Sequence, residues 1–243
     1  MKRKKSIIKP VIDDALVIQA QEDWAIVTGQ TDYPKPIYFK NKVTGNTYSY
    51  IAGAIGWPGD RVPGYALIIA VAKTERPEPP FLILDEAEDS NVVRLLRKCL
   101  VLRDKYGFWE SSEILRHWIG DPDRYDPIVG AFSSKLRKKE GEGEGHGFYI
   151  YSPDDFDRSD FFEICIRQIQ MCLTPNSSGR KRLYIGKNNK LRNHLQNFSK
   201  SIRRQSVEDH PAVFALGGVI HTLIQRKRWV NNSGAEAFNL DDF

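Results

Sequence analysis

Two apolar runs joined by a turn-rich segment dominate the first half of the chain. They are Tyr48–Ile55 and Tyr65–Val71, and the segment between them is rich in glycine and proline. Two β-type runs around such a connection predict a hairpin. A third run, Phe81–Leu84, follows a proline-rich spacer and leads into Asp85 and Glu86. We therefore expect a three-stranded meander whose rim carries carboxylates.

Helical and strand patterns alternate after the meander. Apolar residues recur at helical spacing between Val92 and Tyr106, which predicts an amphipathic helix on the sheet, capped by Asp89 or Ser90. The short apolar stretch Glu113–Ile119 predicts a fourth strand that ends on Asp121. The pattern then predicts a helix from Asp126 through Leu136, a fifth strand at Phe148–Tyr151 and a helix that begins at Ser159 or Asp160.

The C-terminal part is predicted to be mainly helical. Leu183–Ile185 is a short apolar run that fits either a strand or a bent coil, and Leu191–Ile202 has helical spacing. The segment Ser206–Pro211 combines acidic residues with a proline in the first turn, which is typical of a helix start. Gly217 and Gly218 fall inside the following helix, where we expect them to permit a close approach to the sheet.

The two ends of the chain differ from the middle. Residues 1–45 contain possible strands at Trp24–Thr28 and Ile37–Lys40, and we interpret them as an N-terminal extension of the sheet. Residues 46–230 are predicted to form the main domain, and residues 231–243 a polar and acidic tail.

Composition supports one main domain in a reducing, soluble compartment. The chain has 243 residues, of which 41% are hydrophobic, and this content can bury one sizeable core. The 3 cysteines, Cys99, Cys165 and Cys172, are an odd number and are expected to be reduced core thiols. No apolar run is long enough for a signal sequence or a membrane span.

Three meandering strands followed by alternating helices and strands predict an α/β fold with a mixed sheet and helices on both faces. This is the order of the ribonuclease H-like fold. From about Tyr48 to Trp229 the chain also resembles the nuclease domain of the large terminase subunits that package phage DNA. The likeness is carried, in order, by the segments Ala52–Gly59, Trp118–Arg124, Lys181–Gly186 and Glu208–Leu216.

The resemblance implies a phosphodiester-cleaving centre with two Mg²⁺ or Mn²⁺ ions held by carboxylates. Family acids lie at the end of the first strand, at the end of the fourth, and at the start of the last helix. Asp121 matches the second position and Asp209 the third, with Glu208 as a neighbouring ligand. The first position departs from the family, because Gly56 stands where the acid is expected.

A missing first acid leaves two interpretations of the site. Asp60 or Asp85 supplies the absent ligand and gives weak, Mn²⁺-favoured cleavage, because a ligand on a loop holds metal geometry less well than one on a strand. Alternatively, the domain is a degenerate nuclease that binds DNA or a partner without catalysis. A resolvase-type or transposase-type nuclease on the same fold is a further alternative.

The candidate acids also have simpler structural interpretations. Asp209 and Glu208 fit a helix cap, and the triplet that begins at Asp121 fits a turn after a strand. The acidic run that begins at Asp85 fits a solvated strand end followed by a helix start.

Basic residues recur through the C-terminal half and suggest a surface that follows a DNA backbone. The formal net charge of +5 agrees with a polyanionic partner such as double-stranded DNA. The candidate DNA-binding residues are Lys138, Lys139, Arg180, Lys181, Arg182, Lys187, Lys190, Arg192, Arg203 and Arg204.

The phosphate-binding pattern of P-loop motors is not found in the sequence, so we expect no ATP binding by this chain. If a packaging motor takes part, it is a separate polypeptide that docks with this chain and with the portal. The resemblance places such a protein in the cytoplasm of a phage-infected or prophage-bearing bacterial host.

Overall fold

The predicted hairpin is the centre of the sheet in the computed structural model. Strand β3 (Thr47–Gly56) pairs antiparallel with β4 (Gly64–Ala72), and β4 pairs antiparallel with β5 (Phe81–Asp89). The meander is therefore confirmed. The structure describes residues 12–20, 26–30, 37–41, 47–72, 79–106, 118–140, 147–177, 179, 181–186, 190–200 and 209–226.

Two short strands extend the sheet in parallel from the other side of β3. Strand β6 (Trp118–Ile119) pairs with β3 through Gly53 and Ala54, and β7 (Ile150–Tyr151) pairs with β6. The strand order through the middle of the sheet is thus β5-β4-β3-β6-β7, in which β3 is antiparallel to β4 and parallel to β6. Both strands are shorter than the sequence pattern suggested, and residues 113–117 lie outside the described residues.

Further strands bring the mixed sheet to eight strands among the described residues. Strands β1 (Ile26–Gln30) and β2 (Ile37–Asn41) form a hairpin beside the first residues of β3. Strand β8 (Leu183–Tyr184) pairs in parallel with the start of β5, so the segment that fitted a strand or a coil is a strand.

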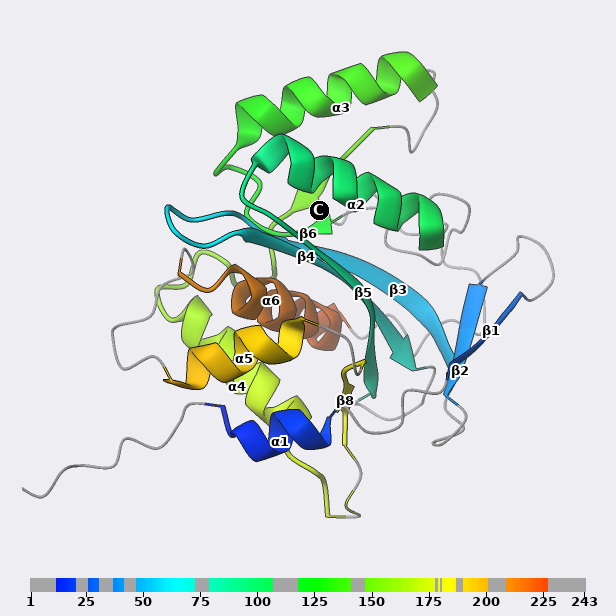
Figure 1. Cartoon of the computed structure of the whole chain (residues 1–243), viewed down its shortest axis with the longest axis vertical. Coiled ribbons are helices and arrows are strands. Elements are labelled where there is room, and N and C mark those ends of the chain that lie inside the picture. Colours follow the sequence, from blue (N-terminus) through cyan, green and yellow to red (C-terminus); the bar gives the residue numbers. More distant parts are fainter. Residues whose placement is uncertain are drawn as a thin grey trace, which may run out of the picture.

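Helices cover both faces of the sheet, as predicted (Figure 1). Helices α2 (Val92–Tyr106) and α3 (Asp126–Glu140) lie on one face. The other face carries α1 (Asp14–Gln19), α4 (Phe161–Leu173), α5 (Leu191–Lys200) and α6 (Pro211–Arg226). Helix α1 was not predicted. Within the described part of the chain, no helix has both the length and the apolarity needed to cross a bilayer.

Strand β4 shows why the central runs are continuously apolar. All its residues are buried, because its alternate side chains enter two different cores. Tyr65, Leu67 and Ile69 face the core on the α6 side, whereas Ala66 and Ile68 face the core under α2 and α3. All three cysteines are free and buried, so their predicted place in the core is confirmed.

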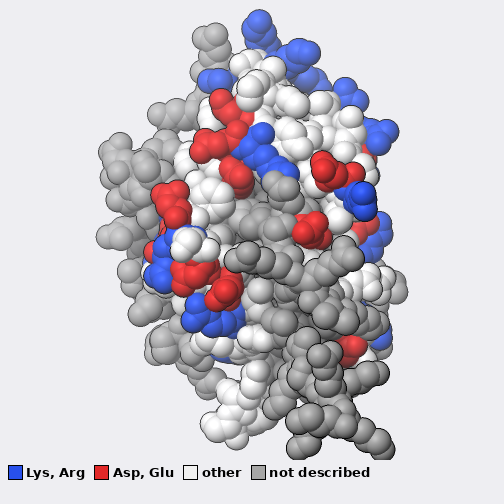
Figure 2. All heavy atoms as spheres, turned by 90° about the vertical axis from the view of Figure 1, so that its left-hand side faces the viewer, with Lys and Arg blue, Asp and Glu red and all other residues white. Residues whose placement is uncertain are grey.

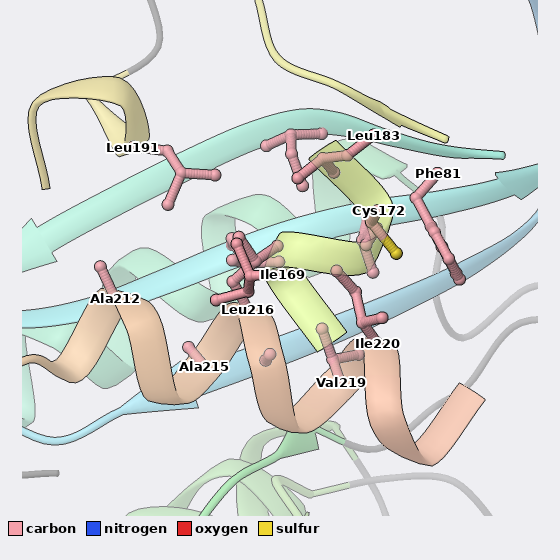
Figure 3. Packing of buried hydrophobic residues seen from close by; sticks show 14 of the residues in the cluster. Phe81, Ile169, Cys172, Leu183, Leu191, Ala212, Ala215, Leu216, Val219 and Ile220 are labelled. Atoms are coloured by element: carbon pink, nitrogen blue, oxygen red, sulfur yellow. The ribbon is translucent and has the colours of Figure 1, made fainter. Parts of the chain in front are cut away.

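Helix α6 is the main element packed on the sheet. Every residue from Pro211 to Leu223 is buried, because β3, β4 and α4 surround the helix. Leu216 and Ile220 lie in one apolar cluster with Ile169 and Cys172 of α4 (Figure 3). This enclosure explains why α6 is apolar on nearly all sides rather than along one stripe.

The glycines inside α6 serve a different contact from the one predicted. A Cβ atom at Gly217 would lie 2.4 Å from Cβ and 2.6 Å from Cα of Cys165 in α4. Gly217 therefore permits a close approach between α6 and α4, not between α6 and the sheet. Helix pairs approach this closely only where one residue has no side chain at the contact.

Strand β5 continues further than its apolar pattern suggested. We expected the strand to stop at Asp85, but pairing with β4 continues to Asp89. The cap of helix α2 is Asn91, whose Oδ1 accepts the N–H of Arg94 at 3.1 Å, and not Asp89 or Ser90 as predicted. Asp89 accepts the N–H of Asn91 at 2.9 Å and so shapes the turn before the helix.

Candidate functional site

The ends of β3 and β6 meet the start of α6 at one place, which we call the β3–β6–α6 junction and define by Gly56, Gly120 and Pro211. A Cβ atom built on Gly56 would lie 2.1 Å from the carbonyl oxygen of Pro211. One built on Gly120 would lie 2.7 Å from the carbonyl oxygen of Ile55. The three backbone segments are therefore closely packed, and the side chain of Ile55 also lies against Gly120.

Asp121 follows directly on this junction. The indole Nε1 of Trp57 donates a hydrogen bond of 2.6 Å to its backbone carbonyl and ties the two strand ends together. The carboxylate Oδ1 accepts the backbone N–H groups of Asp123 at 3.0 Å and Arg124 at 3.3 Å. This is the turn function that the sequence also allowed for Asp121.

Asp209 lies on the other side of the junction, just before α6. Its side chain is exposed, and the chain enters the helix at Pro211. The intervening His210 packs its ring against Phe198 with centroids 4.8 Å apart. Burial lowers the pKa of His210, and the charge of Asp209 acts in the opposite direction. Glu208, the proposed neighbouring ligand, lies outside the described residues.

The two acids proposed as replacements for the missing ligand occupy other places. Asp60 is exposed in the connection between β3 and β4. Asp85 points to the α2 face, where its Oδ2 accepts Lys105 Nζ at 2.6 Å and the Tyr106 hydroxyl at 3.1 Å. The hydrogen bond to Asp85 raises the pKa of Lys105, and burial raises the pKa of Tyr106 to about 12. Asp85 therefore acts as an ion-pair partner of α2 in the structure.

Comparison with protein-family models, with curated proteins and with solved structures gives no match.

The described residues do not fit a two-ion centre. Mg²⁺ and Mn²⁺ need several oxygen ligands that converge on one point. Gly56 supplies none, and one oxygen of Asp121 is held by backbone N–H groups. Among the residues that the structure describes, no three His, Cys, Asp or Glu side chains form a group that could hold a metal. We therefore derive no reaction step through a metal ion.

A polar network that sequence reasoning missed lies beside the junction, on the α6 side of the sheet. The carboxylate of Glu86 accepts the backbone N–H of Leu191 at 2.9 Å, the N–H of Lys190 and the hydroxyl of Tyr65. Glu86 thus caps α5 from a strand far away in the sequence. Burial raises the pKa of Tyr65 well above its ordinary value, and the adjacent Glu86 charge adds to the effect.

The length of β4 is the sequence signal that would have revealed this network. Strands β4 and β5 each have 9 residues and pair from Gly64–Asp89 to Val71–Phe81, with one irregularity between Ile68 and Ile69. If β5 is expected to be as long as β4, the strand extends past Glu86 and Glu88, and both acids then lie on the sheet.

Replacing Glu86 by glutamine is expected to destabilise the protein by about 1–3 kcal/mol, because a charge-assisted helix cap is lost at a partly buried position. Urea unfolding followed by circular dichroism measures this change. Asp157→Asn, at an exposed position, is the matched control and should change the stability by less than about 0.5 kcal/mol. Equal stabilities of Glu86→Gln and Asp157→Asn would contradict the capping role.

Glu88 joins the same network through a histidine. Its carboxylate contacts His194 Nε2 and lies 3.1 Å from Lys190 Nζ. Burial raises the pKa of Glu88, but the hydrogen bonds from His194 and Lys190 outweigh burial and lower it overall. The ionised form is therefore favoured in the folded protein.

A lowered carboxyl pKa gives stability that is present above the ordinary value of 4.5 and is lost as the pH falls through the folded-state value. Glu88→Gln is therefore expected to lower the free energy of unfolding by about 1 kcal/mol at neutral pH. The difference from wild type should shrink as the pH falls below the folded-state pKa of Glu88. Thermal melts between neutral and acidic pH test this. A difference that stays constant across the range would show that the Glu88 charge is not responsible.

The candidate DNA-binding residues are found on opposite sides of the molecule. Lys138 and Lys139 are exposed near the end of α3, on the α2 face. Three others contact the chain itself: Lys181 donates to the Gln19 carbonyl, Arg182 donates to the Met171 carbonyl at 2.5 Å, and Lys190 pairs with Glu88. Arg192 is partly buried on α5. Arg180, Lys187, Arg203 and Arg204 lie outside the described residues.

Proposed function

We propose that this chain is a DNA-binding domain of the ribonuclease H-like nuclease lineage, related in fold to the nuclease domain of phage large terminase subunits, with an impaired metal site. The strand order β5-β4-β3-β6-β7 supports the lineage, since it places an antiparallel meander beside two parallel strands. The last described helix starts at the end of the central strand, which is where the family carries its third acid.

The packing of Gly56 is the observation that supports an impaired metal site. An acid on β3 at this position would need a Cβ atom 2.1 Å from the Pro211 oxygen and 2.7 Å from its carbonyl carbon. Both are backbone atoms of a helix that is buried on all sides, so they have little freedom to move. The first family acid is thus absent, and the space for it is filled.

Double-stranded DNA is the proposed partner. A packaging motor and a portal in a phage-infected or prophage-bearing bacterial cell are the proposed setting. In that setting, ATP would be bound by the motor, and this chain would hold DNA near it.

Binding of a fluorescent DNA duplex to the purified chain, followed by anisotropy, tests the proposal. We expect saturable binding that weakens steeply as salt rises, because phosphate contacts release counterions. Asp121→Ala and Asp209→Ala should retain binding, since neither acid neutralises a phosphate. Failure of the wild type to bind at low salt would refute DNA binding.

A second candidate function is residual metal-dependent cleavage. The presence of Asp121 and Asp209 on either side of the junction favours it. In this alternative, plasmid is nicked slowly in Mn²⁺, and Asp121→Ala or Asp209→Ala abolishes nicking. Cleavage that survives both substitutions would show that the junction is not the cleavage site. A preference for branched DNA or transposon ends over linear duplex would instead favour a resolvase-type or transposase-type enzyme.

A further inference from the structure

Helix α3 has a buried face and a basic face. Its buried residues Val129, Ser133 and Leu136 recur at helical spacing and pack beneath the helix. Lys135, Lys138 and Lys139 are all exposed and lie on the outward part of its surface. We call these three residues the α3 lysine edge. In Figure 2, Lys and Arg side chains gather at the top of the molecule, the level that α3 occupies in Figure 1.

The α3 lysine edge differs from most other basic groups in having no internal partner within the described residues. Many of the other described cations are neutralised: Lys98 pairs with Asp89, Lys190 pairs with Glu88, and Arg158 pairs with Asp160. Arg137, next to the edge, instead lies over the Tyr149 ring, 6.0 Å from its centroid. Unneutralised exposed cations produce the strongest local positive potential and attract a polyanion.

The position of α3 relates this edge to the junction. The helix begins at Asp126, five positions after Asp121. It has 15 residues and is therefore about 22 Å long. At about 3.4 Å per base pair, this length corresponds to roughly six base pairs of duplex.

We infer that the α3 lysine edge is the surface that binds the phosphate backbone of a DNA duplex, which lies along α3 with the junction toward one end. This inference rests on the proposed function. The rise from Lys135 to Lys139 is about 6 Å, so three flexible side chains reach two or three neighbouring phosphates of one strand. Lys is suited to such contacts as a mobile point charge.

The surroundings favour DNA over an acidic protein. Protein interfaces have an apolar core inside a polar rim. Only Ile128 is an exposed large hydrophobic residue among the described residues of α3, at 38% exposure. A positive edge without an apolar centre fits backbone-directed binding of nucleic acid.

The test compares two triple variants that each remove three positive charges. Lys135→Ala, Lys138→Ala and Lys139→Ala together remove the edge. Arg94→Ala, Arg158→Ala and Arg167→Ala remove three ion-paired cations, of which Arg94 is on α2, Arg158 lies before α4 and Arg167 is on α4. Duplex binding is measured by anisotropy over a salt series, and circular dichroism checks the fold of each variant.

We expect the edge variant to bind at least about tenfold more weakly and to reduce the salt slope by about 2 to 3, because each lost phosphate contact lowers the slope by roughly 0.9. The control variant should lose less than about threefold. A charge-preserving variant with arginine at all three positions should bind as the wild type does, even if the alanine variant is less stable.

The outcomes separate the inference from the proposed function. If the wild type binds no duplex, the proposed function fails. If the wild type binds and the edge variant binds equally well, or only the control variant loses binding, the inference fails while the proposed function stands. Equal affinity of the wild type for polyglutamate and for duplex would overturn the choice of DNA as the partner.

Discussion

Gly56→Asp is expected to destabilise the protein by roughly 3 kcal/mol or more, since overpacking alone costs about 1–3 kcal/mol and this contact is backbone against backbone. The new Cβ atom would lie 2.1 Å from the Pro211 oxygen, so β3 and α6 must separate at the centre of the fold. A typical domain has only about 5–15 kcal/mol of stability, so much of the variant is expected to be unfolded in mild urea.

Gly130→Ala is the matched control for this substitution. No atom lies within 4 Å of a Cβ atom at Gly130, which is inside α3. Alanine there is expected to stabilise the protein by up to about 1 kcal/mol through helix propensity. Urea denaturation of both variants measures the contrast. If the Gly56→Asp variant folds and binds Mn²⁺ tightly, packing does not require glycine at this position, and the wild type only lacks a metal ligand there.

Gly217→Ala is the second substitution with a large expected effect, about 2–4 kcal/mol of destabilisation. The added methyl group would lie 2.4 Å from Cβ of Cys165 and 2.7 Å from its carbonyl oxygen. Helix α4 must then move away from α6, and the apolar contacts among Leu216, Ile169 and Cys172 loosen (Figure 3). Chemical denaturation with tryptophan fluorescence measures the loss.

Gly218→Ala provides a control on the same helix. Its Cβ atom would meet Pro153 Cγ at 3.2 Å, a tight contact with a side chain and not with backbone. We expect its effect to be well below that of Gly217→Ala. If both variants lose the same stability, helix propensity rather than the α4 contact explains the loss.

The elements that depend on local pattern were predictable from the sequence. The strands of the central hairpin and helices α2 and α4 have strong apolar periodicity, and each was expected close to where it lies. Proline at the first position of α6 likewise marked the start of that helix. These features depend on residues near one another in the chain, so one sequence contains the information.

Features that depend on distant partners were not predictable in the same way. The acids of β5 looked like a solvated strand end, yet Glu86 caps a helix 105 residues further along the chain. Nothing near Glu86 in the sequence indicates this partner. Strand β8 is short, and it is a strand because it pairs with Phe81 and Leu82 of β5.

Gly56 shows why a resemblance alone does not define the chemistry of a site. The resemblance to the terminase nuclease domain implies that an acid is missing at Gly56. The backbone of Pro211 occupies the space that a side chain needs. This contact brings together residues that are far apart in the chain, so no local pattern around Gly56 contains it.

Gel electrophoresis of plasmid incubated with the wild-type chain in Mg²⁺ and then in Mn²⁺ tests the central claim most directly. DNA binding with an impaired metal site predicts plasmid that is retarded by the protein, uncut in Mg²⁺ and at most slowly nicked in Mn²⁺. Rapid and complete cleavage in Mg²⁺ that is lost in Asp121→Ala would contradict the account, as would plasmid that runs free at every protein concentration.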